Sequence, residues 1–212
     1  MKRSISKQTL QRLPLYLNYL KTLSLNRSAN ISATTISNKL GLNQVQVRKD
    51  LAAVTSGGRP KTGYLVSNLI AEIEQFLRYD HVDNVVIAGA GRLGTALMTY
   101  ASFKDYGIEI VAAFDVNEDL IGTSLGDKTI LSINNLKNVC TSLKINIGII
   151  AVPKEAAQSV CEKMIDSGIR AIWNFAPVHL NVPDYVLVRN ENMAASLALL
   201  SQHFAQKAHE SH

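Results

Sequence analysis

The spacing of apolar residues divides the chain into a helical first part and a second part that alternates strands with helices. In the first part, leucines recur three and four residues apart between about Thr9 and Leu23, which predicts one amphipathic helix. Pro14 interrupts this pattern. Because proline is tolerated in the first turn of a helix, we expect the helix to begin near Leu13.

Two short helices are predicted next. Ser32 is a suitable N-cap for the first, Gly41 suits the left-handed position that ends it, and Asn43 can cap the second. The second helix is expected from Gln44 to Val54. Two short helices joined by a turn that contains glycine are typical of a helix-turn-helix unit.

The face of the second helix that points away from the core carries the candidate DNA contacts. Its apolar positions fall on one side, so periodicity places four residues on the other: Val45, Arg48, Lys49 and Ala52. Arginine and lysine reach guanine edges or phosphates, and small apolar side chains contact thymine methyl groups.

A basic, glycine-rich loop follows, from Ser56 to Tyr64. Its composition predicts a wing, with Leu65-Val66 as the returning strand, and Arg59 and Lys61 are expected to contact phosphates or a narrow minor groove. A linking helix is predicted from Ser67 to Arg78.

The second part has the pattern of a parallel sheet covered on both faces. The expected strands are Asn84–Ala88, Glu109–Phe114, a weak one near Thr129–Leu131, Ile147–Val152, Ala171–Phe175 and Tyr185–Val188. The expected helices run from the glycine motif to about Lys104, from Ser132 or Ile133 to Leu143, and from Lys154 to Ser167.

The last segment, Asn192 to Lys207, is helical and apolar almost all the way round in its first half. Such a helix must be buried on more than one side. Packing on its own sheet and burial against a second subunit both satisfy that requirement.

A Gly-x-Gly-x-x-Gly motif lies between the first strand and the helix after it, and the second strand ends in an acid. Gly89 permits the tight turn, Gly91 lets the backbone approach a pyrophosphate, and Gly94 allows close helix–strand packing. Asp115 is placed to bind the ribose hydroxyls and would repel a 2′-phosphate, so we predict NAD(H) rather than NADP(H).

Two later strand ends are candidates for the nicotinamide half of the site: Ala151-Val152-Pro153 and Asn174-Phe175-Ala176-Pro177. Tyr100, expected two turns into the dinucleotide helix, is by default a core aromatic. Among the histidines only His179 is placed near these segments, so no convincing proton donor is available and we expect a sensor rather than an enzyme.

Charge is distributed unevenly. Residues 1–79 contain 12 Lys/Arg and 3 Asp/Glu, a balance of +9, whereas residues 80–212 have a balance of −4. This favours a nucleic-acid-binding first domain. Because one helix-turn-helix unit buries little surface, we expect a two-fold dimer on an inverted-repeat operator.

Other sequence features bear on the cellular location of the protein and on metal binding. No apolar run is long enough for a membrane span, and no apolar segment follows the basic N-terminus. Cys140 and Cys161 suffice for neither a disulfide framework nor a metal cluster. We expect no metal site and a cytoplasmic protein.

Taken together, these motifs resemble the redox-sensing transcriptional repressor family Rex over nearly the whole chain. The resemblance rests on Val45-Gln46-Val47-Arg48-Lys49-Asp50-Leu51, the wing ending Gly63-Tyr64, Gly89-Ala90-Gly91-Arg92-Leu93-Gly94, Phe114-Asp115-Val116, Val152-Pro153-Lys154-Glu155-Ala156-Ala157 and Asn174-Phe175-Ala176-Pro177.

The resemblance implies an α/β protein with an N-terminal winged-helix domain (1–79), a Rossmann-like doubly wound NAD(H)-binding domain (80–191) and a domain-swapped dimerisation helix (192–212). It implies that the free or NAD+-bound homodimer binds operators and that NADH releases it. It places Tyr100 near the nicotinamide and adds Gln46, Gly63, Tyr64, Ala90, Arg92, Leu93 and Val116 to the candidate contacts.

One departure from the family is visible. Some members pair an arginine in the first helix with an aspartate before the swapped helix, and the corresponding residues here are Asn18 and Asn192. Two other readings of the chain stay open: an NAD-dependent dehydrogenase with an N-terminal extension, and a winged-helix regulator that senses another nucleotide such as coenzyme A.

Overall fold

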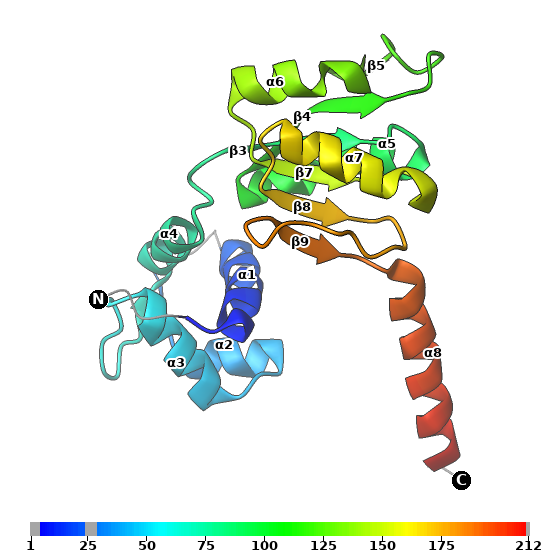
Figure 1. The fold of residues 1–212 in the computed structure, drawn as a ribbon. Helices are drawn as coiled ribbons and strands as arrows, with labels where there is room; N and C mark the ends of the chain where they lie inside the picture. Colours follow the sequence, from blue (N-terminus) through cyan, green and yellow to red (C-terminus); the bar gives the residue numbers. More distant parts are fainter. Residues whose placement is uncertain (1–4, 24–28, 211–212) are drawn as a thin grey trace. The chain divides into compact units, whose positions relative to one another are not determined.

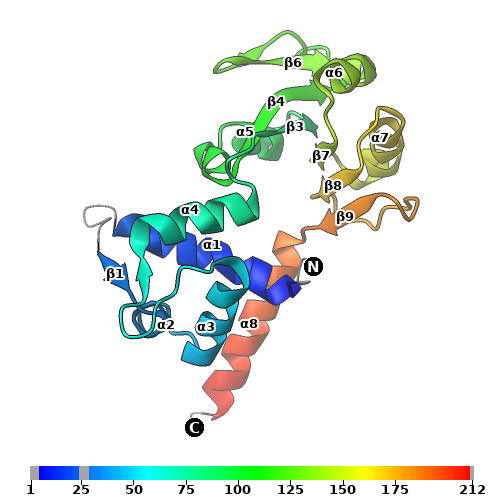
Figure 2. The same cartoon turned by 90° about the vertical axis from the view of Figure 1, so that its left-hand side faces the viewer.

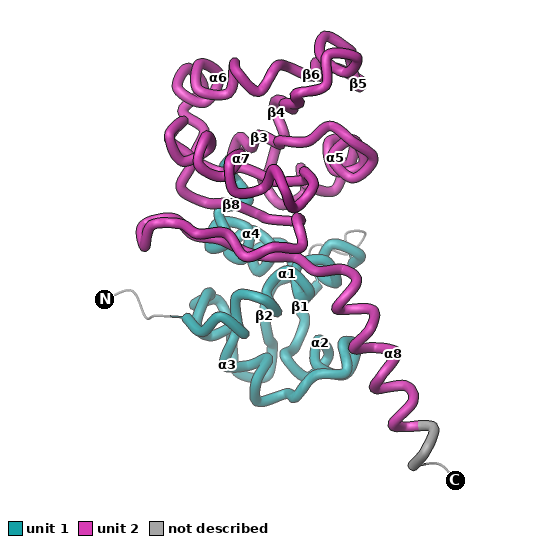
Figure 3. Tube along the Cα trace, turned by 45° about the vertical axis from the view of Figure 1, so that its right-hand side comes forward, with its two compact units in different colours: residues 1–81 teal, residues 82–212 magenta. Residues whose placement is uncertain are grey.

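A computed structural model describes residues 5–23 and 29–210 and separates the chain into two compact units, 1–81 and 82–212 (Figure 3). The tail at 211–212 lies outside the described residues. Within the described part, no helix combines the length and apolar character that a bilayer span needs.

In its described residues, the first unit contains four α-helices and a two-stranded antiparallel ribbon. Its elements are α1 (Lys7–Thr22), β1 (Asn30–Ile31), α2 (Ala33–Leu40), α3 (Gln44–Val54), β2 (Tyr64–Leu65) and α4 (Val66–Leu77) (Figures 1 and 2). One core cluster joins the four helices and includes Leu13, Leu17, Ile36, Leu51 and Ile73, each at most 1% exposed.

The predicted caps of the two short helices are confirmed. The Ser32 side chain accepts a hydrogen bond from the amide of Thr35 (3.0 Å), and Gly41 has φ 64°. Asn43 Oδ1 accepts from the amides of Val45 (2.9 Å) and Gln46 (3.2 Å). These side chains satisfy amides at the helix starts that lack helical partners.

Two expectations for this unit are wrong. The first helix begins at Lys7, so Pro14 lies in its interior. Ser6 caps this helix by accepting from the amide of Thr9 (3.1 Å), which stabilises the turns before the proline. The returning strand is Tyr64–Leu65, because Val66, only 1% exposed, already belongs to α4.

The second unit is built on a seven-stranded sheet in the order β5-β6-β4-β3-β7-β8-β9. The strands are β3 (Asp83–Ala88), β4 (Ile108–Asp115), β5 (Ser124–Leu125), β6 (Lys128–Ser132), β7 (Ile147–Ile150), β8 (Ala171–Asn174) and β9 (Leu187–Asn190). Only β5 runs antiparallel to its neighbour. The six parallel strands have the Rossmann order 3-2-1-4-5-6, and the order reverses between β3 and β7.

Helices cover this sheet unequally (Figure 2). On one face, α6 (Leu136–Leu143) and α7 (Lys154–Asp166) pack over a core that includes Phe114, Ile150 and Met164. On the other face, α5 (Arg92–Met98) and the 3₁₀ turn Ala101–Tyr106 cover β3 and β4. The predicted doubly wound α/β class is confirmed.

Several boundaries in this unit differ from expectation. Strand β7 ends at Ile150 rather than at Val152. The helix after the glycine motif ends at Met98 rather than near Lys104, and a separate 3₁₀ turn follows. The last strand is displaced by two residues, to Leu187–Asn190. Its parallel pairing with β8 sets this register, with Ala171 opposite Leu187.

The terminal helix α8 (Met193–Glu210) begins just after β9. Every side chain from 193 to 207 is exposed. An apolar stripe with spacings of four, three and four residues runs along it: Met193, Leu197, Leu200 and Phe204. Packing on its own sheet, one of the two expected arrangements, is therefore not what the described residues adopt.

Candidate functional site

The glycine loop is shaped by two close backbone approaches. Gly89 has φ 97°, and a Cβ there would collide with the carbonyl of Ala151 at the end of β7. A Cβ at Gly94 would collide with the carbonyl of Gly89. Gly91, by contrast, is exposed and faces open space, so a ligand can approach its backbone.

A pocket of about 230 Å³ lies beside this loop, where the strand order reverses. Its wall is mainly apolar and includes seven of the predicted cofactor residues: Gly89, Gly91, Asp115, Val116, Ala151, Val152 and Pro153. Arg92, Leu93 and Gly94 form the first turn of α5, whose free amide groups favour a phosphate at this end. The loop and the pocket thus have the features expected where part of a dinucleotide binds.

The carboxylate of Asp115 is engaged by backbone amides. Its Oδ2 accepts from the amide of Ala90 (2.7 Å), and its Oδ1 accepts from the amides of Val116 (2.7 Å) and Asn117 (2.9 Å). Asp115 therefore ties the end of β4 to the glycine loop, besides facing the pocket. This second role was not anticipated from the sequence.

Tyr100 is placed differently from the expectation. It lies beyond the end of α5 and is 58% exposed, so the default of a core aromatic is wrong. Edge-to-face contacts connect it to Phe103 (5.1 Å between ring centroids) and Phe103 to Trp173 (6.2 Å), and Trp173 in turn contacts Phe175 (4.5 Å). A series of aromatic contacts thus connects Tyr100 with Phe175, two predicted cofactor residues that do not line the pocket beside the glycine loop.

The turn after β8 is held by Asn174, which is fully buried. Its Nδ2 donates to the carbonyls of Ala176 (3.1 Å) and Val178 (2.9 Å), and its Oδ1 accepts from the amide of Ala176 (3.0 Å). Ala176 is buried in this turn, whereas Pro177 is exposed.

The outward face of α3 carries four of the five predicted helix contacts. Val45 is 60% exposed, and Arg48, Lys49 and Ala52 are also exposed. Gln46 is different: it is half-buried, and its Nε2 donates to Asp50 Oδ1 at 2.8 Å. Its side chain is therefore turned from the outward face toward the helix interface, which argues against the predicted DNA contact.

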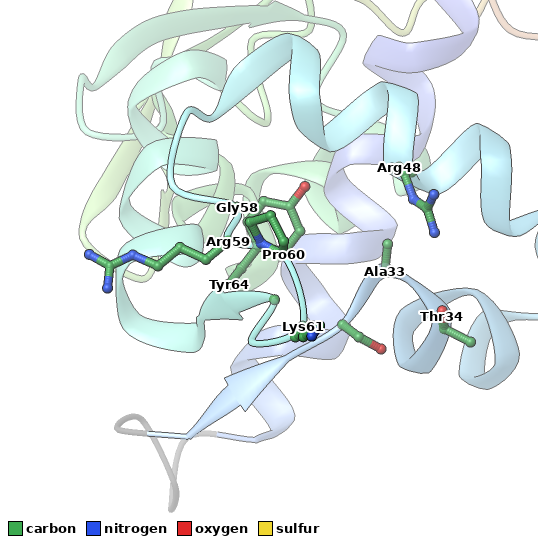
Figure 4. Close-up of a pocket in the computed structure, with 10 residues that line it drawn as sticks. Ala33, Thr34, Arg48, Gly58, Arg59, Pro60, Lys61 and Tyr64 are labelled. Atoms are coloured by element: carbon green, nitrogen blue, oxygen red, sulfur yellow. The ribbon is translucent and has the colours of Figure 1, made fainter.

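The wing is a short hairpin closed by reciprocal backbone hydrogen bonds between Arg59 and Gly63, both 2.9 Å. Gly63 has φ 80°, and a Cβ there would collide with the carbonyl of Ile31. An open pocket of about 500 Å³ lies between the hairpin and the start of α2, and its lining includes Lys61 and Tyr64 as well as Arg48 of α3. In Figure 4, Arg59 extends on the side of the loop opposite Arg48.

Electrostatics in this pocket are dominated by cations. Arg48, Arg59 and Lys61 line it, together with the hydroxyl-bearing residues Ser32 and Thr34. Burial raises the pKa of Tyr64, and the nearby charge of Arg48 opposes that rise. A concave basic surface beside an exposed helix face suits a nucleic-acid backbone.

The sequence reasoning missed a polar cluster behind the recognition face. Asp50, on the inward side of α3, accepts hydrogen bonds from Thr9, Arg12 and Tyr16 of α1 as well as from Gln46. The available signal was a charged residue three positions after buried Val47, on the apolar face of the helix.

Comparisons with known proteins cover both units. A family model described as "Putative DNA-binding protein N-terminus" matches residues 4–52, and one described as "CoA binding domain" matches residues 80–178. Curated relatives named "Redox-sensing transcriptional repressor Rex" include one from Porphyromonas gingivalis, 37% identical over 92% of this chain and 90% of its own length. Another, from Clostridium beijerinckii, is 39% identical over 93% of this chain and 94% of its own length.

Solved structures agree. A crystal structure of RSP with NAD+ and operator DNA is 33% identical, with a TM-score of 0.90, and the match covers 99% of this chain and 97% of that one. RSP with NADH gives a TM-score of 0.85 over 99% of this chain and 98% of that one. A further structure of the same protein is described as a Rex-family repressor.

Proposed function

Because the chain belongs to the Rex family of redox-sensing transcriptional repressors, we propose that it binds operator DNA as a homodimer and releases it when NADH binds. One observation carries this proposal. A pocket beside a Gly-x-Gly-x-x-Gly loop, at the point where the strand order reverses, is joined in one chain to a helix-turn-helix with a basic wing.

The pocket supports NADH and NAD+ as the ligands. We infer that the glycine loop and the first turn of α5 receive the pyrophosphate and that Asp115 receives the ribose hydroxyls. We assign Ala151, Val152 and Pro153 to the nicotinamide side, with Tyr100 and the Phe175-Ala176-Pro177 turn farther out. RSP is described with both cofactors bound, which supports the same pair here.

The DNA interface is assigned to the outward face of α3 and to the wing. Arg48 and Lys49 contact base edges or phosphates, Val45 and Ala52 contact thymine methyl groups, and the wing contacts backbone or minor groove through Arg59, Lys61, Gly63 and Tyr64. Gln46 is left out of this interface, because its amide donates to Asp50.

The apolar stripe of α8 supports a homodimer. Leu197, Leu200 and Phe204 are 68%, 64% and 75% exposed, and isolated chains rarely leave such a stripe in water. In unit 2, the sheet face beyond α5 leaves Leu187 of β9 73% exposed. We infer that α8 of each chain is buried by its partner, as the family resemblance implies.

Control of DNA binding requires two dimer conformers. NADH and NAD+ differ in the charge and pucker of the nicotinamide ring, and each shifts the conformers only by its differential affinity for them. Release by NADH therefore requires that NADH bind the DNA-incompetent conformer more tightly. By reciprocity, operator DNA must weaken NADH binding.

We place the protein in the cytoplasm, where a sensor of this kind meets both DNA and the cofactor pool. The dehydrogenase reading has little support: His179 is exposed, and the relatives are named as repressors. The coenzyme A reading deserves a test arm, because a family model of that description matches the second unit.

The decisive test is a mobility-shift assay on an inverted-repeat duplex selected by the wild-type protein from a random pool, with NADH, NAD+, NADPH and coenzyme A added in turn. We expect NADH alone to release the duplex. Equal NADH affinity with and without the duplex contradicts the proposed mechanism, and release by coenzyme A instead of NADH favours the alternative ligand.

A further inference from the structure

The charged residue buried behind the recognition helix has an unusual set of partners. Asp50 is 2% exposed and lies on the inward side of α3, next to Leu51 and one turn from Val47, both fully buried. An isolated carboxylate in such a place is strongly unfavourable unless it is fully hydrogen-bonded.

Helix α1 supplies most of the bonds that Asp50 needs. Arg12 donates through Nε to Oδ2 (2.7 Å) and through its terminal nitrogen to Oδ1 (3.1 Å), and the Tyr16 hydroxyl donates to Oδ2 (2.8 Å). Thr9 Oγ1 donates to Oδ1 (3.0 Å), and Gln46 Nε2 of α3 donates to the same oxygen (2.8 Å). Both carboxylate oxygens are thus fixed from three turns of α1.

The ionisation of the cluster agrees with this geometry. Burial acts to raise the pKa of Asp50, but the hydrogen bonds from Arg12, Tyr16, Gln46 and Thr9 together hold it below its usual value. Burial and the bond to Asp50 raise the pKa of Tyr16 to about 12. Asp50 is therefore an anion, and Tyr16 keeps the proton that it donates.

Hydrogen bonds constrain the rotation of α3 more sharply than apolar packing does. Val47 and Leu51 lie in the same core cluster as residues of α1, α2 and α4, but hydrophobic contacts are non-directional. Hydrogen bonds to a carboxylate are directional. Arg48 and Lys49 immediately precede Asp50 on the same helix. Any rotation of α3 that moves Asp50 therefore also moves these two side chains relative to the bases of bound DNA.

We propose that Arg12, Tyr16 and Gln46 act through Asp50 as positioning residues that fix the orientation of α3 and thereby set operator specificity, without contacting DNA themselves. This inference rests on the DNA interface proposed above. It predicts that weakening the cluster lowers affinity for the operator more than affinity for unrelated DNA, because phosphate contacts tolerate rotation better than base contacts.

The test compares Tyr16→Phe and Asp50→Asn with the matched control Glu74→Gln. Tyr16→Phe removes one hydroxyl and keeps the shape of the side chain. Glu74 lies on α4 and forms an ion pair with Lys21 of α1 (2.8 Å). This pair therefore joins α1 to α4 and leaves α3 untouched. Glu74→Gln makes the same change in charge as Asp50→Asn, so it controls for the added positive charge.

Affinities for the selected inverted-repeat duplex and for an unrelated duplex of equal length are measured at two salt concentrations. For Tyr16→Phe we expect operator affinity to fall about fivefold to tenfold, with unrelated binding and its salt slope nearly unchanged. Asp50→Asn should lower operator affinity by a larger factor. Glu74→Gln should keep the wild-type ratio of operator affinity to affinity for the unrelated duplex. If Asp50→Asn does not fold, Tyr16→Phe alone decides.

Equal losses on both duplexes, as expected from a smaller folded fraction, would overturn the positioning role, as would no loss in Tyr16→Phe. The proposed function is tested separately in the same assay. A wild-type protein that selects a duplex while the variants keep its specificity contradicts only this inference. A wild-type protein that selects no duplex contradicts both.

Discussion

Helices α3 and α8 have opposite surroundings in the same chain. The apolar side of α3 is covered within its own unit, where Val47 and Leu51 have no exposed surface, and its outward side carries the cations Arg48 and Lys49. On α8 the apolar stripe is itself exposed, with Leu197 at 68% and Phe204 at 75%.

The difference shows which parts of the protein are complete in one chain. A covered apolar face with exposed cations describes a helix that is ready to meet a polyanion. An exposed apolar stripe describes a helix that still requires another protein surface. We therefore expect α3 to fail mainly through lost contacts with DNA and α8 to fail through lost assembly.

The largest effect is expected from a charge in the stripe of α8. Leu200→Asp places a carboxylate where the partner must bury it without a counter-charge, at a cost of several kcal/mol, so the dimer dissociation constant should rise at least about 100-fold. Analytical ultracentrifugation over a concentration series measures this change. Operator affinity should fall with it, because a monomer contacts only one half-site.

Gln202→Asp is the matched control, since it adds the same charge on the opposite side of α8. It should leave the dimer intact. A Leu200→Asp protein that remains a dimer with normal operator affinity would mean that α8 is not at the dimer interface. The inference that its exposed stripe requires a partner surface would then be wrong.

A smaller effect is expected at Asp115 in the other unit. Asp115→Ala removes the carboxylate assigned to the ribose and also the bond to the Ala90 amide, so NADH affinity should fall about 10- to 100-fold, as for the loss of charged hydrogen bonds. Fluorescence titration with NADH measures it. Operator binding by the cofactor-free protein should persist.

Glu118→Ala is the control for this change, because Glu118 is an exposed carboxylate three residues farther along. If Asp115→Ala abolished both NADH binding and cofactor-free operator binding, the residue would be needed for folding rather than for the ligand. Unfolding of the second unit would then also abolish DNA binding by the first, although the two units have separate cores.

Local signals predicted the fold well. The caps at Ser32 and Asn43, the left-handed Gly41 and the close packing at Gly94 all follow from short-range stereochemistry, which the sequence displays directly. The parallel sheet follows from apolar strands that alternate with helices, but the order of its strands was not predicted.

Features that depend on tertiary contacts were harder to predict. Pro14 was placed at a helix start because proline favours the first turn, whereas the turns before it are also held by bonds from Thr9 and Arg12 to Asp50 on α3. Gln46 was added to the candidate DNA contacts by the family resemblance, which does not tell which way a long amide turns, and the structure shows its Nε2 donating to Asp50. Tyr100 was displaced by the early end of α5.

The smallest effect is expected at the wing. Lys61→Ala removes one exposed cation that lines the basic pocket, so affinity should fall about threefold to tenfold on operator and unrelated DNA alike, and the salt slope should decrease by about one. Lys137→Ala makes the same charge change on α6 of the other unit and should alter neither. Mobility shifts from low to moderate salt compare the two variants.

Equal effects from both lysines would mean that overall charge, rather than the wing, governs binding. A loss of affinity confined to the operator would assign Lys61 to base readout instead of the phosphates.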